Sequence, residues 1–284
     1  MSAPLNIQAR LTEIGNAEDD DISLARAALV LAAADRPGVS MDPYLRHLQQ
    51  LASDVRDYAD APGRENPDPG EALDFRVEAL VQVIVRRYGY GGSDAVFDDL
   101  DAANLMRVID NRSGLPVALG ILFITTARAQ GWAATGLDFP GRFLVRLDAG
   151  GQRMIIDPFA GGACVDAPAM RGMFKAIAGN HVELTPEHYR DMGNRDILLR
   201  LQDNIKSRLV RRERWDDAIR VLEAMLLFAP GRTGLWREAG LLLARLDRIE
   251  TAVRALEEYL RRTGAEDKRY KASVLLQDLR ARLN

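Results

Sequence analysis

Cysteine and histidine are scarce in this sequence of 284 residues, which contains one cysteine, Cys164, and three histidines, His47, His181 and His188. A single cysteine cannot form a disulfide within the chain, and such scarcity is typical of proteins in a reducing compartment. Zinc sites use cysteine and histidine ligands at close, regular spacing, whereas these four residues are scattered. We therefore expect no metal site, and we expect no cofactor.

Long apolar segments are also absent. The main apolar stretch runs from Leu115 to Ala127 and ends at Arg128, so it is shorter than the roughly 20 residues that cross a bilayer. Residues 1–21 have neither a basic start nor an apolar block, which are the two marks of a secretory signal. We therefore expect a cytoplasmic protein that makes no contact with a membrane.

A strong charge of one sign is lacking as well. The formal net charge is −3, with 38 Lys and Arg against 41 Asp and Glu. Residues 191–284 contain 20 basic and 15 acidic residues, a net of +5, which leaves −8 for residues 1–190. This difference indicates two parts of different composition. A net of +5 that is interleaved with acids does not indicate a nucleic-acid partner, and we expect none.

Hydrophobic periodicity predicts a mostly helical N-terminal part. Hydrophobic residues recur at spacings of three and four between residues 21 and 60, and helix is again expected between residues 71 and 88. A buried helix is expected from about residue 115 to residue 130. Ser113 is its candidate capping residue, and Pro116 stands in its first turn, where the missing N–H is not needed.

A β-hairpin is predicted after this helix. Two short runs of alternating hydrophobic residues flank Gly150 and Gly151, which suit a two-residue turn. With that turn, Leu144 faces Asp157 across the strand pair, and Arg142 becomes the diagonal neighbour of Asp157 on the same face. This register brings the side chains of Arg142 and Asp157 into contact.

The C-terminal part contains an internal repeat with a period of about 34 residues, which is the period of tetratricopeptide repeats. In the second copy, Trp236 and Gly240 have the spacing of the repeat's first helix, and the small Ala252 allows the second helix to pack closely. Pro230 stands at the end of the first copy, where such a repeat has its final proline. Two copies followed by a final helix are therefore predicted. A shift by one period superimposes Leu201 on Leu235, Leu209 on Leu243, Arg211 on Arg245, Ala218 on Ala252, Leu222 on Leu256, Glu223 on Glu257 and Leu226 on Leu260.

The order of motifs in the N-terminal part resembles the bacterial SirB-type family. The motifs begin at Asn111 (NRSGLP), Phe139 (FPGRF) and Ile156 (IDPF). The resemblance implies an α+β fold class: a mostly helical transglutaminase-like, or cysteine-protease-like, domain with a small antiparallel sheet, then an all-α tetratricopeptide-repeat module. We expect three segments, namely an N-terminal tail at residues 1–20, the transglutaminase-like domain at residues 21–190, and two repeats with a capping helix at residues 191–284.

The resemblance also implies the place of a catalytic triad. In the wider transglutaminase-like superfamily, a cysteine at the start of the helix, a histidine on the next strand and an aspartate on the strand after it form a Cys-His-Asp triad. The helix N-terminus lowers the pKa of the thiol, and the histidine moves the proton. The matching positions here are Pro116, Arg142 and Asp157. Proline has no nucleophile, and arginine exchanges no proton at neutral pH, so we expect no cysteine-type catalysis.

Two interpretations of the Arg142 and Asp157 pair stay open. The pair could bind an amide or a carboxylate in a small pocket, or it could be a structural ion pair on a partly solvated sheet face, which we favour. We interpret Cys164 as a small buried cysteine and His47 as a solvated or capped residue of a helix. An alternative function is a hydrolase or amide-processing enzyme with a non-cysteine mechanism, whose candidate general bases are Asp157, Asp138 and Asp98.

The repeat module offers a second candidate site. Basic residues at one helix end could hold an acidic peptide or a C-terminal carboxylate, or they could simply solubilise that helix end. Together with the lost triad, the module predicts a pseudoenzyme that acts as a protein-interaction or scaffold protein. Its protein or peptide partner would bind the repeats, the remnant pocket at Asp157, or both. The basic residues are Lys206, Arg208, Arg211, Arg212 and Arg214.

Overall fold

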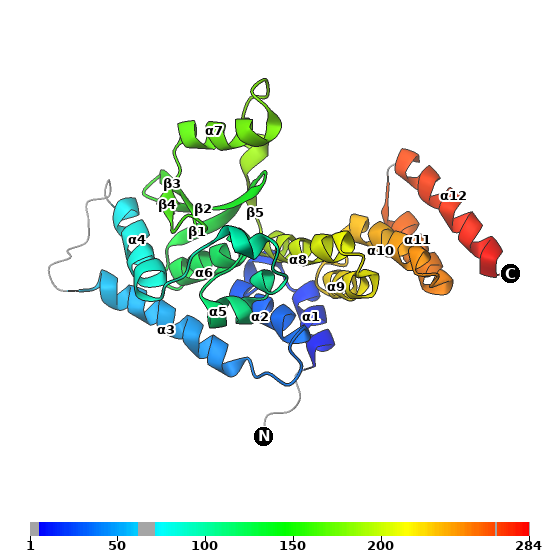
Figure 1. Cartoon of the computed structure of the whole chain (residues 1–284), viewed down its shortest axis with the longest axis horizontal. Coiled ribbons are helices and arrows are strands. Elements are labelled where there is room, and N and C mark those ends of the chain that lie inside the picture. Colours follow the sequence, from blue (N-terminus) through cyan, green and yellow to red (C-terminus); the bar gives the residue numbers. More distant parts are fainter. Residues whose placement is uncertain (1–5, 62–71, 265, 284) are drawn as a thin grey trace. The chain divides into compact units, whose positions relative to one another are not determined.

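The computed structural model describes residues 6–61, 72–264 and 266–283. The chain divides into two compact units, one formed mainly by Glu18–Leu201 and the other by Leu5–Ala17 with Gln202–Asn284 (Figure 1). Helices dominate, and they accompany one small antiparallel sheet, which confirms the predicted fold class. Within the described residues, no helix has both the length and the apolar character needed to cross a membrane.

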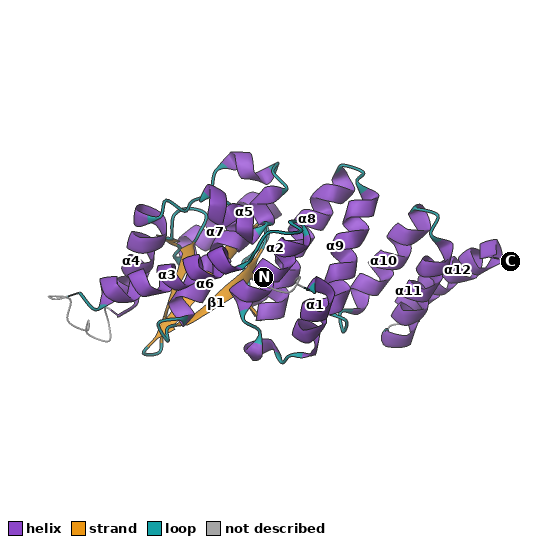
Figure 2. Cartoon of the chain, turned by 90° about the horizontal axis from the view of Figure 1, so that it is seen from below, coloured by secondary structure: helices purple, strands orange, loops and turns teal. Residues whose placement is uncertain are grey.

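The first unit surrounds a five-stranded antiparallel sheet with helices, and Figure 2 shows the strands in orange among them. The strand order is β4-β3-β2-β1-β5. The strands are β1 (Ala133–Phe139), β2 (Arg142–Ala149), β3 (Gln152–Asp157), β4 (Ala163–Cys164) and β5 (Arg190–Met192). The helices are α2 (Leu24–Ala34), α3 (Asp42–Ala59), α4 (Ala72–Leu80) with a π-helical continuation (Val81–Arg87), α5 (Leu105–Asn111), α6 (Pro116–Arg128), α7 (Ala167–Ala178) and the start of α8 (Asn194–Arg211).

Helix α6 is the buried centre of the first unit. Ten of its residues are buried, and it packs on strands β1 and β2. Gly120 makes this close approach possible, because a Cβ added there would lie 2.3 Å from the ring of Phe143 on β2. The predicted buried helix is therefore confirmed, and its apolar run is explained by burial on all sides.

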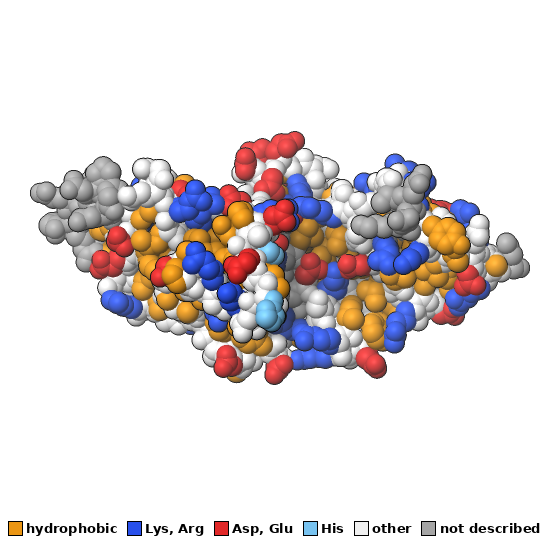
Figure 3. Space-filling view, turned by 90° about the horizontal axis from the view of Figure 1, so that it is seen from above, with side chains coloured by type: hydrophobic (Ala, Val, Ile, Leu, Met, Phe, Trp, Pro, Cys, Tyr) orange, Lys and Arg blue, Asp and Glu red, His pale blue; other side chains and the backbone are white. Residues whose placement is uncertain are grey.

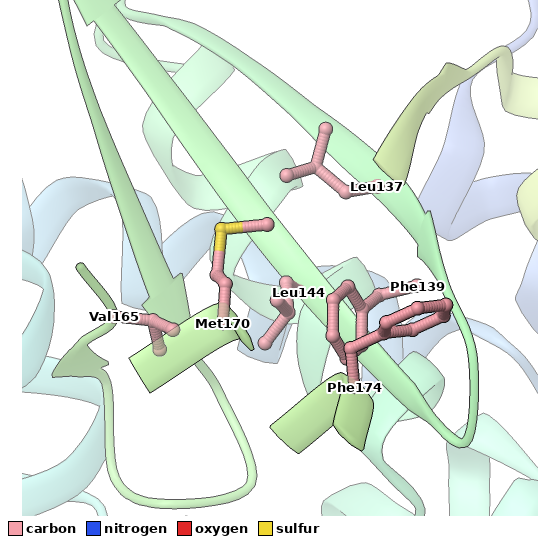
Figure 4. Close-up of a cluster of buried hydrophobic side chains, with 6 residues drawn as sticks. All are labelled: Leu137, Phe139, Leu144, Val165, Met170 and Phe174. Atoms are coloured by element: carbon pink, nitrogen blue, oxygen red, sulfur yellow. The ribbon is translucent and has the colours of Figure 1, made fainter. Parts of the chain in front are cut away.

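The other face of the sheet is covered by α7. Successive side chains of a strand point to opposite faces, so Leu144 points away from the α6 side that Phe143 occupies. Leu144 packs with two side chains of α7 in a small hydrophobic core (Figure 4). The six buried members of this core are Leu137, Phe139, Leu144, Val165, Met170 and Phe174.

The predicted hairpin and its register are confirmed. Gly150 and Gly151 form the turn between β2 and β3, with φ angles of 56° and 80° that suit glycine. Val145 pairs with Ile156, so the next position places Leu144 opposite Asp157, as the two-residue turn requires. The register is therefore determined by the turn, because a one-residue slip would move each side chain to the other face of the sheet.

The second unit is entirely helical and begins with a helix where we expected a tail. Helix α1 (Ile7–Asn16) packs on α9 (Trp215–Phe228), with Leu11 buried. Gly15 allows the close approach, because an added Cβ would lie 2.3 Å from the backbone oxygen of Leu227. Packing on α9, which is distant in the sequence, stabilises this short helix. The sequence of residues 7–16 alone does not reveal that contact. Residues 1–5 lie outside the described part.

The repeat helices follow one another in the order that the repeat period predicts. After the end of α8, helix α9 packs on α10 (Thr233–Arg245), α10 on α11 (Ile249–Arg262), and α11 on α12 (Glu266–Leu283). Gly240 of α10 faces Leu256 of α11, and an added Cβ would lie 2.6 Å from that side chain. The small residue thus serves the close helix pairing that the sequence pattern indicated.

Replacing Gly120 by alanine tests the packing of α6. Alanine favours helix over glycine by about 1 kcal/mol, but the added methyl group overlaps the Phe143 ring. We expect Gly120→Ala to lower the free energy of unfolding by about 1–3 kcal/mol, measured by urea denaturation. Gly172 in α7 is the matched control, because no atom lies within 4 Å of its added Cβ. Gly172→Ala should stabilise the protein, so a shift of both variants in the same direction would contradict this packing.

Candidate functional site

The N-terminus of α6, where the resemblance places a nucleophile, begins with a proline. Leu115 is the N-cap residue, and its backbone N–H donates to the oxygen of Ala102 at 2.8 Å. Pro116 is the first helical residue. The expectation that Ser113 caps this helix is wrong, because Ser113 precedes the N-cap by two residues and pairs with Gly91 in a β-bridge. Position 116 therefore offers neither a thiol nor a hydroxyl group.

The predicted contact between Arg142 and Asp157 is confirmed. Nη1 of Arg142 lies 2.6 Å from Oδ2 of Asp157. Oδ1 of Asp157 accepts hydrogen bonds from the backbone N–H groups of Phe159 at 2.9 Å and Ala160 at 3.3 Å. The side chain of Asp157 is 2% exposed, whereas that of Arg142 is 42% exposed. Both carboxylate oxygens are thus bound by donors, which compensates for burial of the charge.

The pair is solvated on one side only, because Arg142 is partly exposed whereas Asp157 is buried. Asp157 ends β3, and the chain folds back over its carboxylate in the turn that leads to β4. The backbone oxygen of Asp157 accepts a further hydrogen bond from Gly162 at 2.8 Å. Asp157 therefore stabilises the turn after β3 and also binds Arg142 of the neighbouring strand β2. This structural role is sufficient to explain why its carboxylate is buried.

Arg200 of α8 holds the end of the hairpin that carries Arg142. It pairs with Asp138 and donates to the backbone oxygens of Phe139 at 3.0 Å and Arg142 at 2.5 Å. Its guanidinium lies 5.9 Å from the ring centroid of Phe143. Burial lowers the pKa of Arg200, and the charge of Asp138 opposes this effect. Asp138, a candidate base in the alternative function, is thus engaged in an ion pair.

The interpretation of Cys164 as a buried cysteine is wrong. Cys164 lies in β4, the edge strand of the sheet, and is exposed. Its Sγ lies 3.5 Å from Sδ of Met154. Partial desolvation raises the pKa of the thiol, and the negative charge of Asp74 adds to the increase. The thiol is therefore accessible to solvent but is not activated as a nucleophile.

His188 has a structural position after α7. Its Nδ1 accepts a hydrogen bond from the backbone N–H of Thr185 at 3.0 Å, and its ring packs on Phe174 at a centroid distance of 4.3 Å. It thereby caps the short helical turn Pro186–Tyr189. These contacts connect His188 to the hydrophobic core that α7 forms with the sheet. They account for its position by a structural role.

Sequence reasoning missed a polar cluster around His47 of α3. Nε2 of His47 lies 2.8 Å from the Tyr90 hydroxyl and 2.6 Å from Nη1 of Arg112. Arg112 also donates to the Tyr90 hydroxyl, and its guanidinium lies 4.9 Å from the Tyr90 ring centroid and 5.6 Å from that of Tyr88. The Tyr88 hydroxyl donates to Asp54 of α3 at 2.7 Å. The cluster therefore ties α3 to the segment that leads into α6.

The electrostatics of this cluster keep His47 neutral. Desolvation lowers the pKa of His47 to about 4, and the charge of Arg112 acts in the same direction, opposed by Asp54. A neutral imidazole can accept a hydrogen bond from Arg112, which has a left-handed backbone conformation with a φ of 56°. His47 is thus half-buried and paired, not simply solvated. Its position two turns before Asp54, on one helix face, was the available sequence signal.

The basic residues of the repeat module do not form one exposed surface, so the predicted patch is wrong in part. Lys206 is 8% exposed and Arg208 is 7% exposed. Nζ of Lys206 pairs with Asp203 at 2.6 Å and with Glu238 at 2.5 Å. Arg208 donates to the backbone oxygen of Asn204 at 2.6 Å. The exposed members of the predicted patch are Arg211, Arg212 and Arg214.

The repeat register explains why Lys206 is buried. A shift by one repeat period places Lys206 on Gly240, a position that faces the second helix of its repeat. Neutralisation by two carboxylates makes burial of the ammonium group possible, and hydrogen bonds to Asp203 and Glu238 raise its pKa against the effect of desolvation. The repeat therefore indicated that Lys206 is buried. The predicted patch missed this because it grouped basic residues by their closeness in the sequence.

Two cavities in the first unit are lined by residues other than Asp157. One has a volume of about 430 Å³ and lies between Arg56, Arg76 and Trp132. The other has a volume of about 560 Å³ and lies between Arg128, Arg146 and Asp191. Among the described residues, no group of three or more His, Cys, Asp and Glu side chains could hold a metal ion. The Asp157 site is therefore a packed ion pair rather than the lining of either cavity.

The burial of His47 makes folding stability depend on pH. The pKa is about 4 in the folded chain and about 6.5 in the unfolded chain, so the unfolded state binds more protons between these values. The stability is complete above pH 6.5 and falls as the pH decreases towards 4. Because His47 is only half-buried, we expect a loss of about 1–2 kcal/mol after allowance for solvent screening. Urea titrations at several pH values measure it.

The matched variants for this prediction are His47→Gln and His181→Gln. Glutamine at position 47 keeps an acceptor for Arg112 but does not titrate, so His47→Gln should remove this part of the pH dependence. His181 is exposed in the loop after α7, so His181→Gln should leave the pH dependence unchanged. Equal slopes for wild type and His47→Gln would show that His47 does not resist protonation.

The reactivity of Cys164 tests whether its thiol is activated. Because its pKa is raised, we expect iodoacetamide to modify the single thiol at neutral pH more slowly than it modifies glutathione, by a factor of several. Replacing Asp74 by asparagine removes one cause of the raised pKa and should increase the rate. Mass spectrometry follows the modification. A rate above that of glutathione would indicate an activated thiolate and would contradict the interpretation of the site.

Comparison with protein families agrees with this architecture. A model described as the transglutaminase-like superfamily matches residues 42–203, and a tetratricopeptide-repeat model matches residues 205–277. The N-terminal match contains positions 116, 142 and 157. The second match begins within α8 and ends within α12. No solved structure shows a significant match.

Bacterial relatives extend the comparison. A UPF0162 protein of Xylella fastidiosa (strain Temecula1) is 26% identical over 254 residues, which are 87% of this chain and 86% of the relative. Protein SirB1 of Salmonella typhimurium is 27% identical over 188 residues, 66% of this chain and 70% of the relative. The UPF0162 protein YchA of Escherichia coli K12 is 26% identical over 189 residues, with the same coverage. The chain therefore belongs to the transglutaminase-like superfamily and is a SirB-type protein with C-terminal tetratricopeptide repeats.

Proposed function

We propose that this chain is a non-catalytic member of the superfamily that acts in the bacterial cytoplasm by binding another protein. The observation that carries the proposal is the Arg142–Asp157 pair, together with Pro116 at the start of α6. A single exposed thiol and the bacterial relatives are consistent with a reducing cytoplasm. The same chain combines a domain without a usual nucleophile and a repeat module of a kind that commonly binds peptides.

The chemistry of the site supports the absence of acyl transfer. A triad needs a nucleophile, a group that accepts and returns its proton, and a carboxylate that orients that group. Proline at position 116 cannot attack a carbonyl, and a guanidinium group such as that of Arg142 has donors only and no acceptor for a proton. The carboxylate of Asp157 accepts three hydrogen bonds and is buried. Each of the three roles is therefore replaced by a structural one.

The distribution of charge favours a protein partner over a nucleic acid. Many arginines of the repeat module pair with a carboxylate within it, for example Arg248 with Asp216 and Arg280 with Glu257. On the face shown in Figure 3, Lys and Arg side chains are interspersed with Asp and Glu. Nucleic-acid binding requires a basic surface that releases counterions from the phosphates. A surface with mixed charges is more typical of a protein-binding module.

Activity assays with an Asp157→Asn variant test the proposal. Asparagine keeps an acceptor for the backbone of Phe159 but removes the charge that pairs with Arg142. We expect the free energy of unfolding to fall by about 1–2 kcal/mol. We expect neither wild type nor variant to hydrolyse amide, ester or thioester substrates above the uncatalysed rate, measured by mass spectrometry of the products.

Two outcomes of that experiment are decisive. If the wild type is active and Asp157→Asn is not, the chain is a hydrolase or amide-processing enzyme of another mechanism. If both proteins are inactive, affinity capture from a native bacterial lysate tests the binding function, with Gly172→Ala as a folded control. A set of specifically enriched proteins supports the proposal, and no enrichment in either sample contradicts it.

A further inference from the structure

Two arginines of the first unit differ from their neighbours in how their charge is balanced. Arg36, Arg142 and Arg200 each form an ion pair with an aspartate. Arg56 of α3 and Arg76 of α4 form no ion pair within the part of the chain that the structure describes. Both side chains line the cavity of about 430 Å³. Two guanidinium groups without a carboxylate in contact therefore share one cavity.

Each of these guanidinium groups is held by one backbone oxygen. Nη1 of Arg76 donates to the oxygen of Asp148 at 3.2 Å, and Nη2 of Arg56 donates to that of Ala129 at 3.5 Å. A guanidinium has five N–H donors, so most donors of both side chains make no hydrogen bond to a described residue. Arg76 is half-buried and Arg56 is exposed. These donors are therefore available to a ligand in the cavity.

The cavity lies where the ends of three helices meet. Helix α3 ends there with Ala59 and is followed by Asp60, α4 begins there with Ala72, and Ala129 follows α6. The three helices pack on one another within the first unit (Figure 1). The two arginines are thus carried on packed helices rather than on loops, which limits their movement when the cavity is empty.

The charged side chains give the cavity a positive sign. Arg56 and Arg76 stand against one carboxylate, that of Asp60, which leaves a net of +1. Helices α3 and α6 also end at the cavity and α4 begins there. With about half a charge at each helix end, these dipoles sum to about −0.5. The side chains therefore outweigh the helix dipoles, and the cavity attracts an anion.

Aromatic side chains form another part of the lining. Phe75 and Trp132 are both half-buried. The guanidinium of Arg76 lies 5.6 Å from the ring centroid of Trp132, so the charged and the aromatic parts of the cavity are adjacent. Aromatic side chains pack favourably against other rings. A ligand that joins an anionic group to a ring would therefore contact both parts.

We propose that this cavity binds a small aromatic anion, whose carboxylate or phosphate group is held by Arg56 and Arg76 and whose ring packs on Phe75 and Trp132. Arginine suits both anionic groups, because its planar fork donates two parallel hydrogen bonds to a pair of oxygens. A volume of about 430 Å³ is within the usual range of ligand pockets. The inference goes beyond the proposed function, because it assigns a small ligand to the first unit and involves no partner protein.

Calorimetric titration of the full chain with phenyl phosphate tests the proposal. Phenyl phosphate carries the anionic group and the ring, benzyl alcohol has the ring without a charge, and methyl phosphate has the charge without a ring. We expect a Kd below about 1 mM for phenyl phosphate. Binding of each of the other two compounds should be weaker by about tenfold or more, because each loses one of the two sets of contacts.

Benzoate in the same titration distinguishes the two kinds of anion. Tighter binding of benzoate than of phenyl phosphate would identify an aromatic carboxylate as the ligand class. Tighter binding of phenyl phosphate would identify an aromatic phosphate monoester. Either result supports an anion site, whereas the absence of binding by both compounds to the folded wild type overturns the proposal.

The variants Arg56→Gln and Arg76→Gln test the two donors. Each change removes one positive charge from the lining, and we expect each to weaken binding of phenyl phosphate by about tenfold or more. Arg46→Gln is the matched control, because Arg46 is exposed on α3 and does not line the cavity. The same change of charge at position 46 should leave the Kd unchanged. Thermal unfolding checks that the three variants stay folded.

The aromatic part of the site has a separate test. Trp132→Leu should weaken binding of phenyl phosphate by about fivefold or more, because it removes the ring on which the ligand packs. The proposal is overturned if this variant has the affinity of the wild type, or if methyl phosphate binds as tightly as phenyl phosphate. Equal losses in Arg46→Gln and Arg76→Gln would also overturn it, since they would show a general effect of net charge rather than a site.

Discussion

The burial of the Asp157 carboxylate is the constraint on which the structure around Arg142 and the turn after β3 depends. A buried charge is tolerated only when donors replace its water, and Asp157 obtains them from Arg142 and from the turn that follows β3. In the superfamily a histidine would use such a carboxylate for orientation. Here the donor is Arg142, whose guanidinium forms both a hydrogen bond and an ion pair with the carboxylate.

A second constraint governs the repeat module, because each first helix presents a face that a second helix can cover. This one requirement accounts for two unrelated observations, namely the burial of the charged Lys206 and the exposure of the apolar Tyr270 and Val274. Residue type alone suggests the reverse assignment, with lysine at the surface and valine in the core. Position in the period, and not residue type, decides both cases.

The sequence predicted those features that depend on local geometry. A two-residue turn determined the register of the hairpin and the contact between Arg142 and Asp157, and the repeat period determined the helix order. Several of the errors concern contacts between distant segments. Helix α1 is stabilised by α9, and Cys164 is exposed because β4 is an edge strand. The cluster of His47, Tyr90 and Arg112 joins three segments, and no local pattern contains it.

The His47–Arg112 contact and the Arg142–Asp157 pair have similar structural roles in the first unit. Near α6, His47 accepts from Arg112 and resists protonation, while Arg142 donates to the buried carboxylate of Asp157. Hydrogen bonds from arginine thus hold both the segment before α6 and the end of β3. These contacts favour a fixed local shape in this part of the first unit, which suits the binding role that we propose.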